Sequence, residues 1–443
     1  MGLRDRIATE RDGTAGTGDG VAYYRKRLLE EVDLSEFATL SDPQRRARLE
    51  RVVGRMVSRE GPVLTTAERT RLIRRVIDEA IGLGVLEPLL ADPTVTEIMV
   101  NGTEEIFVER EGRLQRSDIR FSDEAQLYQT IDRIVSQVNR RVDESSPMVD
   151  ARLPTGERVN VIIPPLALHG PTITIRRFPR LFTLQQLVGL ESLDAPVEAL
   201  LRAFVRAKLN VVISGGTGAG KTTLLNALSA AVPGSERIIT VEDNAELRLQ
   251  QPHVVALEAR PANVEGRGEV TIRDLVRNSL RMRPDRIIVG EVRGAETLDM
   301  LQALNTGHEG SLVTVHANSA DDAMHRLETL ATMSDLQLPF EALRDQINNA
   351  IDVIVQIDRY ADGQRRIAEV AVVASSRRET FRLAPVARFD AEPVGGDRRV
   401  SGRFAHERLP ALIARRLLLA GEPVPREFAE AAEREGAIRE AVA

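Results

Sequence analysis

An octapeptide in the middle of the chain constrains the fold more than any other feature of the sequence. Residues 215–222 read GGTGAGKT and have the complete GxxxxGK(S/T) spacing of a phosphate-binding P-loop. The motif lies between an apolar run at 210–214 and a helical pattern at 221–231, the context that a P-loop requires. Glycines let the backbone N–H groups face phosphates, and the helix N-terminus adds partial positive charge. The residues expected to hold the nucleotide are Gly215, Gly216, Thr217, Gly218, Ala219, Gly220, Lys221, Thr222 and Thr223.

Lysine is scarce in this chain, because only three of its 60 basic residues are Lys. One of them, Lys221, stands at the P-loop position that reaches the β- and γ-phosphates, and Thr222 offers a hydroxyl to Mg²⁺. A Gly-rich turn without a nucleotide is the plain alternative. A rare residue type at the required position favours the nucleotide site.

The composition excludes several other classes of protein. The chain has 443 residues, enough for about three domains, and no apolar run approaches the roughly 18 residues of a membrane span. It has no cysteine, which excludes disulfides, zinc fingers and iron–sulfur sites. The net charge of -6 argues against a general nucleic-acid-binding surface. The start, residues 1–20, has no apolar signal-peptide core and is expected to be a disordered tail, so we expect a soluble, cytoplasmic protein.

Hydrophobic periodicity divides the chain into four segments. Residues 1–64 are predicted as a disordered start and a helical extension, and 65–182 as an α+β domain that opens with a capped amphipathic helix. Residues 183–375 alternate strand, turn and helix in the manner of an α/β domain with a parallel sheet. Residues 376–443 are left as a C-terminal tail of unknown role. The strands expected in the α/β domain are 210–214, 237–241, 254–258, 286–289 and 311–315, with a closing hairpin at 352–357 and 367–373.

Carboxylates follow two of the predicted strands of the α/β domain. Glu291 ends the apolar run 286–289, and Glu242 ends the run 237–241. Because ligands bind at the carboxyl ends of parallel strands, both are candidates for orienting water or, with Thr222, for holding Mg²⁺. We favour Glu291 for water activation. The alternatives are that Glu291 only pairs with Arg293 and that Glu242 opens a solvated acidic loop.

Two histidines, His308 and His316, stand at opposite ends of the predicted strand 311–315. From their positions alone, a structural role is the commoner one for such residues.

Taken together, these segments resemble the secretion traffic ATPases of type II and type IV secretion systems, over about residues 82–373. Four family boxes occur in order: Walker A at 215–222, the Asp box at 240–247, Walker B at 290–293 and the His box at 306–316. The residues between the boxes, notably 281–285 and 304–308, look most like the tight-adherence (Tad) pilus branch, the CpaF-like proteins.

The resemblance implies a RecA-like P-loop motor domain preceded by a smaller α+β domain, assembled as a hexameric ring. It places Glu242 in the catalytic Asp box and His308 and His316 near the γ-phosphate. It also implies that arginines of the α+β domain contact phosphate. Those arginines are Arg152, Arg158, Arg176 and Arg177.

The implied function is ATP hydrolysis with Mg²⁺ that powers assembly of a Tad/Flp-like type IV pilus or a related type II secretion apparatus. The implied partners are membrane-embedded platform proteins at the inner face of the cell membrane and, indirectly, pilin subunits. A type IV secretion or conjugation ATPase of the same family, which exports protein or DNA, is the nearest alternative. A helicase and a nucleotide-gated scaffold with little turnover are more distant ones. Cargo, direction of movement, order of hydrolysis and the identity of the water-activating glutamate stay open.

Overall fold

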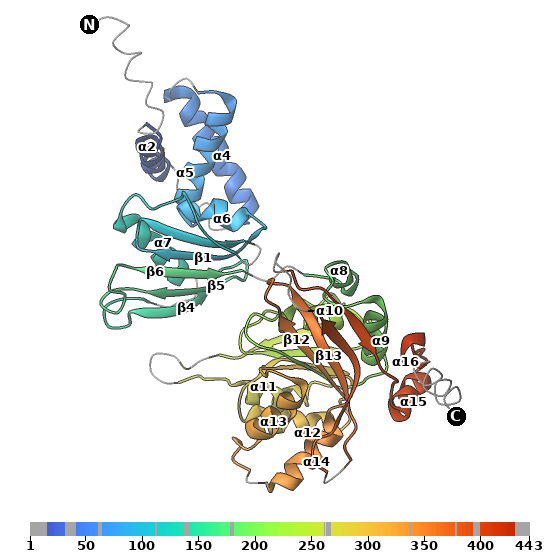
Figure 1. Cartoon of the computed structure of the whole chain (residues 1–443). Helices are drawn as coiled ribbons and strands as arrows, with labels where there is room; N and C mark the ends of the chain where they lie inside the picture. Colours follow the sequence, from blue (N-terminus) through green and yellow to red (C-terminus); the bar gives the residue numbers. More distant parts are fainter. Residues whose placement is uncertain are drawn as a thin grey trace, which may run out of the picture. The chain divides into compact units, whose positions relative to one another are not determined.

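The computed structural model describes residues 16–31, 41–60, 64–110, 113–136, 141–177, 181–260, 262, 267–336, 338–376, 379–392 and 399–429. The chain forms two compact units that divide between residues 178 and 179, a few residues before the predicted boundary. Figure 1 shows their helices and strands, coloured along the sequence.

Three helices open the first unit: α2 (Gly16–Glu31), α4 (Asp42–Glu60) and α5 (Thr66–Ile81). They share a core to which all three contribute, including Tyr24, Val53 and Ile77. The predicted capping box of Thr65 and Glu68 starts α5, and Gly82 ends it. The predicted disordered start is wrong for residues 16–20, which lie in α2, while residues 1–15 lie outside the described part. The structure also has no domain boundary at residue 64, where one was predicted, because α5 shares a core with the helical extension.

The rest of the first unit is one antiparallel sheet packed against a helix, α7 (Glu124–Ser136), after the short η1 (Gly84–Leu86) and α6 (Glu87–Ala91). Alternate residues of the strands, such as Ile98, Val159 and Ile175, join α7 in the core. The strand residues that alternate with these, such as Arg158, Asn160 and Thr174, lie on the other face. The strand order is β3-β2-β1-β6-β5-β4, with β1 (Val95–Asn101), β2 (Glu105–Arg110), β3 (Arg113–Arg116), β4 (Met148–Arg152), β5 (Arg158–Ile162) and β6 (Thr172–Arg176).

The second unit is a mixed nine-stranded sheet with the order β15-β14-β13-β12-β7-β11-β10-β8-β9. Its parallel strands are β7 (Val211–Ser214), β8 (Ile238–Glu242), β9 (Val254–Glu258), β10 (Arg286–Val292), β11 (Leu312–Val315) and β12 (Val353–Arg359). Antiparallel strands continue the sheet beyond β12: β13 (Arg365–Val373), β14 (Leu383–Ala391) and β15 (Gly402–His406). The five predicted parallel strands are confirmed to within three residues at either end.

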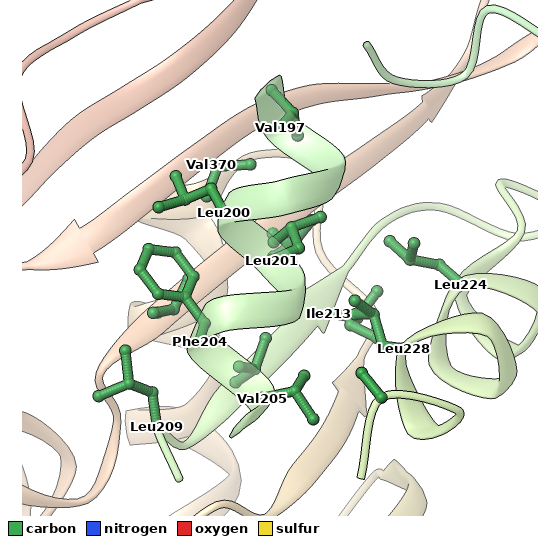
Figure 2. Close-up of a cluster of buried hydrophobic side chains, with 14 of the residues drawn as sticks. Val197, Leu200, Leu201, Phe204, Val205, Leu209, Ile213, Leu224, Leu228 and Val370 are labelled. Atoms are coloured by element: carbon green, nitrogen blue, oxygen red, sulfur yellow. The ribbon is translucent and has the colours of Figure 1, made fainter. Parts of the chain in front are cut away.

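Helices cover both faces of this sheet (Figure 1), as the doubly apolar pattern of its strands requires. On one face lie α8 (Leu184–Gly189), α9 (Ala195–Arg206) and α10 (Lys221–Ser229). Figure 2 shows how Leu201 and Val205 of α9 lie towards Ile213 of β7 and Leu228 of α10, while Leu200 lies beside Val370 of β13. On the other face lie α11 (Ile272–Ser279), α12 (Glu296–Asn305), α13 (Ala320–Ala331) and α14 (Phe340–Ala350).

The second unit does not end at the predicted position, Ser375. Residues beyond it form β14 and β15, and then α15 (Ala411–Leu419) and α16 (Arg426–Ala429). Leu417 and Phe428 are fully buried in the same core as Phe204 and Val386. The described part of the predicted tail is therefore an integral part of the second unit.

Candidate functional site

The parallel register brings the ends of four strands to one edge of the second unit's sheet. Val315 lies opposite both Ser214 of β7 and Val292 of β10, and Val289 of β10 lies opposite Val241 of β8. The P-loop follows Ser214 directly. The carboxyl ends of these strands are therefore one site, where a doubly wound sheet binds its ligands.

The P-loop curls around the ammonium group of Lys221. Its Nζ donates to the carbonyl oxygens of Gly215 at 2.9 Å and Gly216 at 3.1 Å. Gly218 and Gly220 have φ of 71° and 103°, which only glycine adopts readily, and α10 starts directly after Gly220. Burial lowers the pKa of Lys221, while the nearby charge of Glu291 acts in the opposite direction. The predicted nucleotide-binding residues therefore form a curled loop on a helix N-terminus, with a cation at its centre.

Glu242 is buried beside the end of β10, and only 3% of it is exposed. A Cβ on Gly290 would lie 2.9 Å from Cγ of Glu242, so glycine at 290 makes room for this side chain. Its Oε2 accepts backbone N–H bonds from Glu246 at 2.7 Å and Leu247 at 3.0 Å. Among the described residues, Oε1 has no hydrogen-bond partner. The alternative of a solvated acidic loop is therefore wrong for Glu242.

Burial raises the pKa of Glu242 from its ordinary value of 4.5 to about 7, although the two backbone bonds act in the opposite direction. A carboxyl group that titrates near neutral pH can exchange a proton with water at working pH.

This pKa predicts a pH-dependent stability. Because folding raises the pKa of Glu242, the folded chain binds the proton more tightly, and its stability falls as pH rises from about 4.5 towards 7. Glu242→Gln removes this pH-dependent loss of folding stability. We expect the variant to gain roughly 2 kcal/mol of unfolding free energy relative to wild type between pH 5 and pH 8. Denaturant titration without nucleotide and with a metal chelator measures it, and a difference that is constant with pH would contradict the raised pKa.

Glu291 lies at the same edge as Glu242 and is more exposed. The Arg293 guanidinium donates to Glu291 at 2.9 Å and also to Asp243 at 3.3 Å. The predicted alternative, a pair between Glu291 and Arg293, is thus present. It does not remove Glu291 from the site, because the charge of Glu291 acts on Lys221. Arg293 therefore links Asp243, which follows β8, to Glu291, which lies in β10.

The structure separates the two histidines. His316 follows β11 directly, at the edge that carries the P-loop. His308 precedes the same strand, and its Nδ1 lies 3.2 Å from the carbonyl oxygen of Ala303 in α12. At about 3.3 Å per strand residue, a four-residue strand spans roughly 13 Å. The predicted position of His308 at the γ-phosphate is therefore wrong for the nucleotide of the same chain.

Three of the four predicted phosphate-contacting arginines form a row across the first unit's sheet. Arg158 lies opposite Arg152 on β4 and opposite Arg176 on β6. Residues that are directly opposite on antiparallel strands share a face, here the face away from the core residues Val159 and Ile175. Like charges in such positions repel each other, which favours an anion beside them.

Arg177 does not belong to this row. Its guanidinium donates to the backbone carbonyl oxygens of Val95, at 2.9 Å, and of Asp92. The side chain thus fixes the turn before β1, which corrects the expectation that it contacts phosphate.

Sequence reasoning missed three polar side chains at the P-loop edge. Ser214 and Gln356 lie opposite each other on β7 and β12, and within the described chain Ser214 Oγ and Gln356 Oε1 are buried without a hydrogen-bond partner. A polar residue at the end of an apolar strand run was the signal. The third is Arg365, which donates to the P-loop, and nothing in the sequence distinguishes it from the many other arginines.

No cluster of three or more His, Asp or Glu within the described ranges could hold a metal ion without further ligands. A magnesium ion that is held mainly by phosphates and water needs only one or two protein oxygens. The unpartnered Oε1 of Glu242 and the hydroxyl of Thr222 at the start of α10 are oxygen ligands of the kind that Mg²⁺ prefers. The residues present thus fit a phosphate-bound Mg²⁺.

None of the described helices combines the length and the apolar character that crossing a membrane needs.

Comparisons with known proteins agree with one another. The model of the type II/IV secretion system protein family matches residues 79–398. A putative conjugal transfer protein of Mycobacterium tuberculosis is 44% identical over 309 residues, which are 68% of this chain and 87% of that protein. Conjugal transfer protein TrbB of Rhizobium radiobacter is 33% identical over 73% of this chain and 96% of its own length. The pilus retraction motor PilT, solved with bound ADP, shares the fold with a TM-score of 0.51 and 21% identity, over 67% of this chain and 84% of that one.

Proposed function

The chain belongs to the type II/IV secretion system protein family, and on that premise we propose that it hydrolyses ATP to drive a secretion or pilus-assembly machine. The observation that carries the proposal is the sheet edge where the P-loop, with Lys221 at its centre, meets the strand-end carboxylates Glu242 and Glu291. Phosphoryl transfer needs these parts: a cradle for phosphates, a cation and an acid that orients water.

Each residue has a proposed role in hydrolysis. The backbone N–H groups of the P-loop bind the phosphates, and Lys221 neutralises charge that develops on the γ-phosphate. Glu291 activates the attacking water by accepting its proton, and the buried Glu242 orients that water. His316, at the same edge, is proposed to sense or orient the γ-phosphate. Thr222, with Glu242 or Glu291, would hold Mg²⁺, which when bound neutralises phosphate charge.

The arginine row of Arg152, Arg158 and Arg176 is proposed to contact nucleotide phosphates as well. We propose that copies of the chain assemble as a hexameric ring, and that release of the γ-phosphate removes attractive contacts and so drives movement. The ring works at the inner face of the cell membrane, to which platform proteins attach it.

Two machines that the chain could drive are supported to different degrees. The relatives named for conjugal transfer favour export of protein or DNA through a type IV secretion machine. Assembly of a Tad-like pilus is the second candidate, favoured by the residues at 281–285 and 304–308, which resemble that branch.

Phosphate release from ATP by the purified chain, together with its mass from light scattering, tests the proposal. We expect turnover with Mg²⁺ that is lost on addition of a chelator and restored by excess Mg²⁺. With ATP, the mass should reach six times the 48.9 kDa of one chain. Nucleotide binding without turnover, in the presence of membranes and platform proteins as well, would support a nucleotide-gated scaffold instead.

A further inference from the structure

The hairpin of β12 and β13 lies against the P-loop. Since β12 pairs in parallel with β7, with Gln356 opposite Ser214, its last residues run beside the loop that follows β7. A Cβ on Gly215 would lie 2.4 Å from the carbonyl oxygen of Ile357, so only glycine allows this approach. The P-loop is therefore supported from the side by a long-range element.

Arg365, at the start of β13, is the side chain that connects the hairpin to the P-loop. Its Nε donates to the carbonyl oxygen of Gly218 at 2.8 Å. A Cβ on Gly220 would lie 3.2 Å from Cδ of Arg365, so the aliphatic stem runs along the loop. The N–H on the other side of the same peptide unit, that of Ala219, donates to Gly216 at 3.3 Å. The peptide unit between Gly218 and Ala219 is thus held at both ends.

The hairpin that carries Arg365 is itself held by the strands beyond it. Arg366 is 2% exposed, forms an ion pair with Asp362 at 3.2 Å, and lies 5.5 Å and 5.3 Å from the ring centroids of Tyr360 and Phe389. Asp362 also accepts the backbone N–H of Val400 at 3.1 Å. The turn of the hairpin is therefore fixed to β14 and to the segment that precedes β15.

We propose that Arg365 is a positioning residue for nucleotide binding, an inference that rests on the proposed function. By holding the carbonyl of Gly218, it keeps the P-loop in its curled conformation before the phosphates arrive. A loop that is already ordered loses less conformational entropy when it binds. The C-terminal strands, through the hairpin, thereby contribute to nucleotide affinity without contacting the nucleotide.

Binding of ADP by calorimetry tests this role without depending on hydrolysis. Arg365→Gln is expected to raise the Kd for ADP about tenfold, while kcat at saturating ATP changes by less than about threefold. Arg365→Lys, which can still donate to a carbonyl, should recover most of the affinity. Arg359→Gln is the matched control, because Arg359 lies opposite Arg365 in the same hairpin and is also exposed.

Three outcomes would overturn the proposal. Wild-type affinity in Arg365→Gln would show that the bond to Gly218 does not matter. An equal loss in Arg359→Gln would show that only the charge of the hairpin matters, and an equal loss in Arg365→Lys would exclude the donor role. If the wild-type chain itself bound no ADP, the proposed function would fail and this inference with it.

Discussion

Lys221→Ala is expected to lower kcat/KM for ATP hydrolysis by about 10³-fold. Lys221 is the cation around which the P-loop closes, and its ammonium lies within 3.1 Å of two loop carbonyls. Removing it takes away a charge-assisted contact to the phosphates and leaves developing negative charge without its nearest counter-charge. Steady-state phosphate release over a range of ATP concentrations measures the loss.

The scarcity of lysine supplies a matched control for this experiment. Lys208 lies before β7, at the opposite edge of the same sheet, where it is 3.9 Å from Glu236 in a half-buried ion pair. Glu236 also accepts hydrogen bonds from Arg286 and so keeps a counter-charge without Lys208; Lys208→Ala should therefore keep the wild-type rate within about twofold. If Lys221→Ala hydrolysed ATP at the rate of Lys208→Ala, the P-loop would not be the site of hydrolysis.

Glu291→Gln is expected to lower kcat by between about 10² and 10⁴ while leaving ATP affinity nearly unchanged. The amide keeps the size of the side chain and loses the ability to accept a proton from water. Glu242→Gln should cost less, about tenfold, if Glu242 only orients the water. Single-turnover phosphate release measures the rate of the chemical step, and a separate binding experiment measures ATP affinity, so effects on the two can be distinguished.

Comparison of the two glutamine variants assigns the water-activating residue. If Glu242→Gln lowered kcat more than Glu291→Gln, Glu242 would be the residue that activates water and Glu291 the one that orients it. This would agree with the pKa of about 7 that burial gives Glu242. Glu309→Gln is the control, since Glu309 is an exposed carboxylate at the opposite edge of the sheet. Losses below about threefold in both strand-end variants would exclude general-base catalysis by either of them.

Local sequence patterns were sufficient to predict the P-loop together with the strand before it and the helix after it. The P-loop and the apolar strands around it are contiguous in sequence, and their spacing alone sets a strand, a curled loop and a helix N-terminus. The rule that ligands bind at the carboxyl ends of parallel strands then predicted that Glu242 and Glu291 lie at one edge, as the register confirms; His316, which only the family resemblance had placed there, follows β11 at the same edge. These features could be predicted because they depend on neighbours in the chain and on one general rule of topology.

Only the tertiary structure decided which distant residues serve this edge and which do not. Packing between segments far apart in the sequence decided that residues of the predicted tail form β14 and β15 on the second unit's core, and that Arg365 contacts the P-loop. Tertiary contacts also distinguish Arg177 from the other three predicted arginines, because its side chain donates hydrogen bonds to backbone carbonyl oxygens near β1. Burial, which sequence spacing does not report, raised the pKa of Glu242, and the sheet as a whole placed His308 at the far edge.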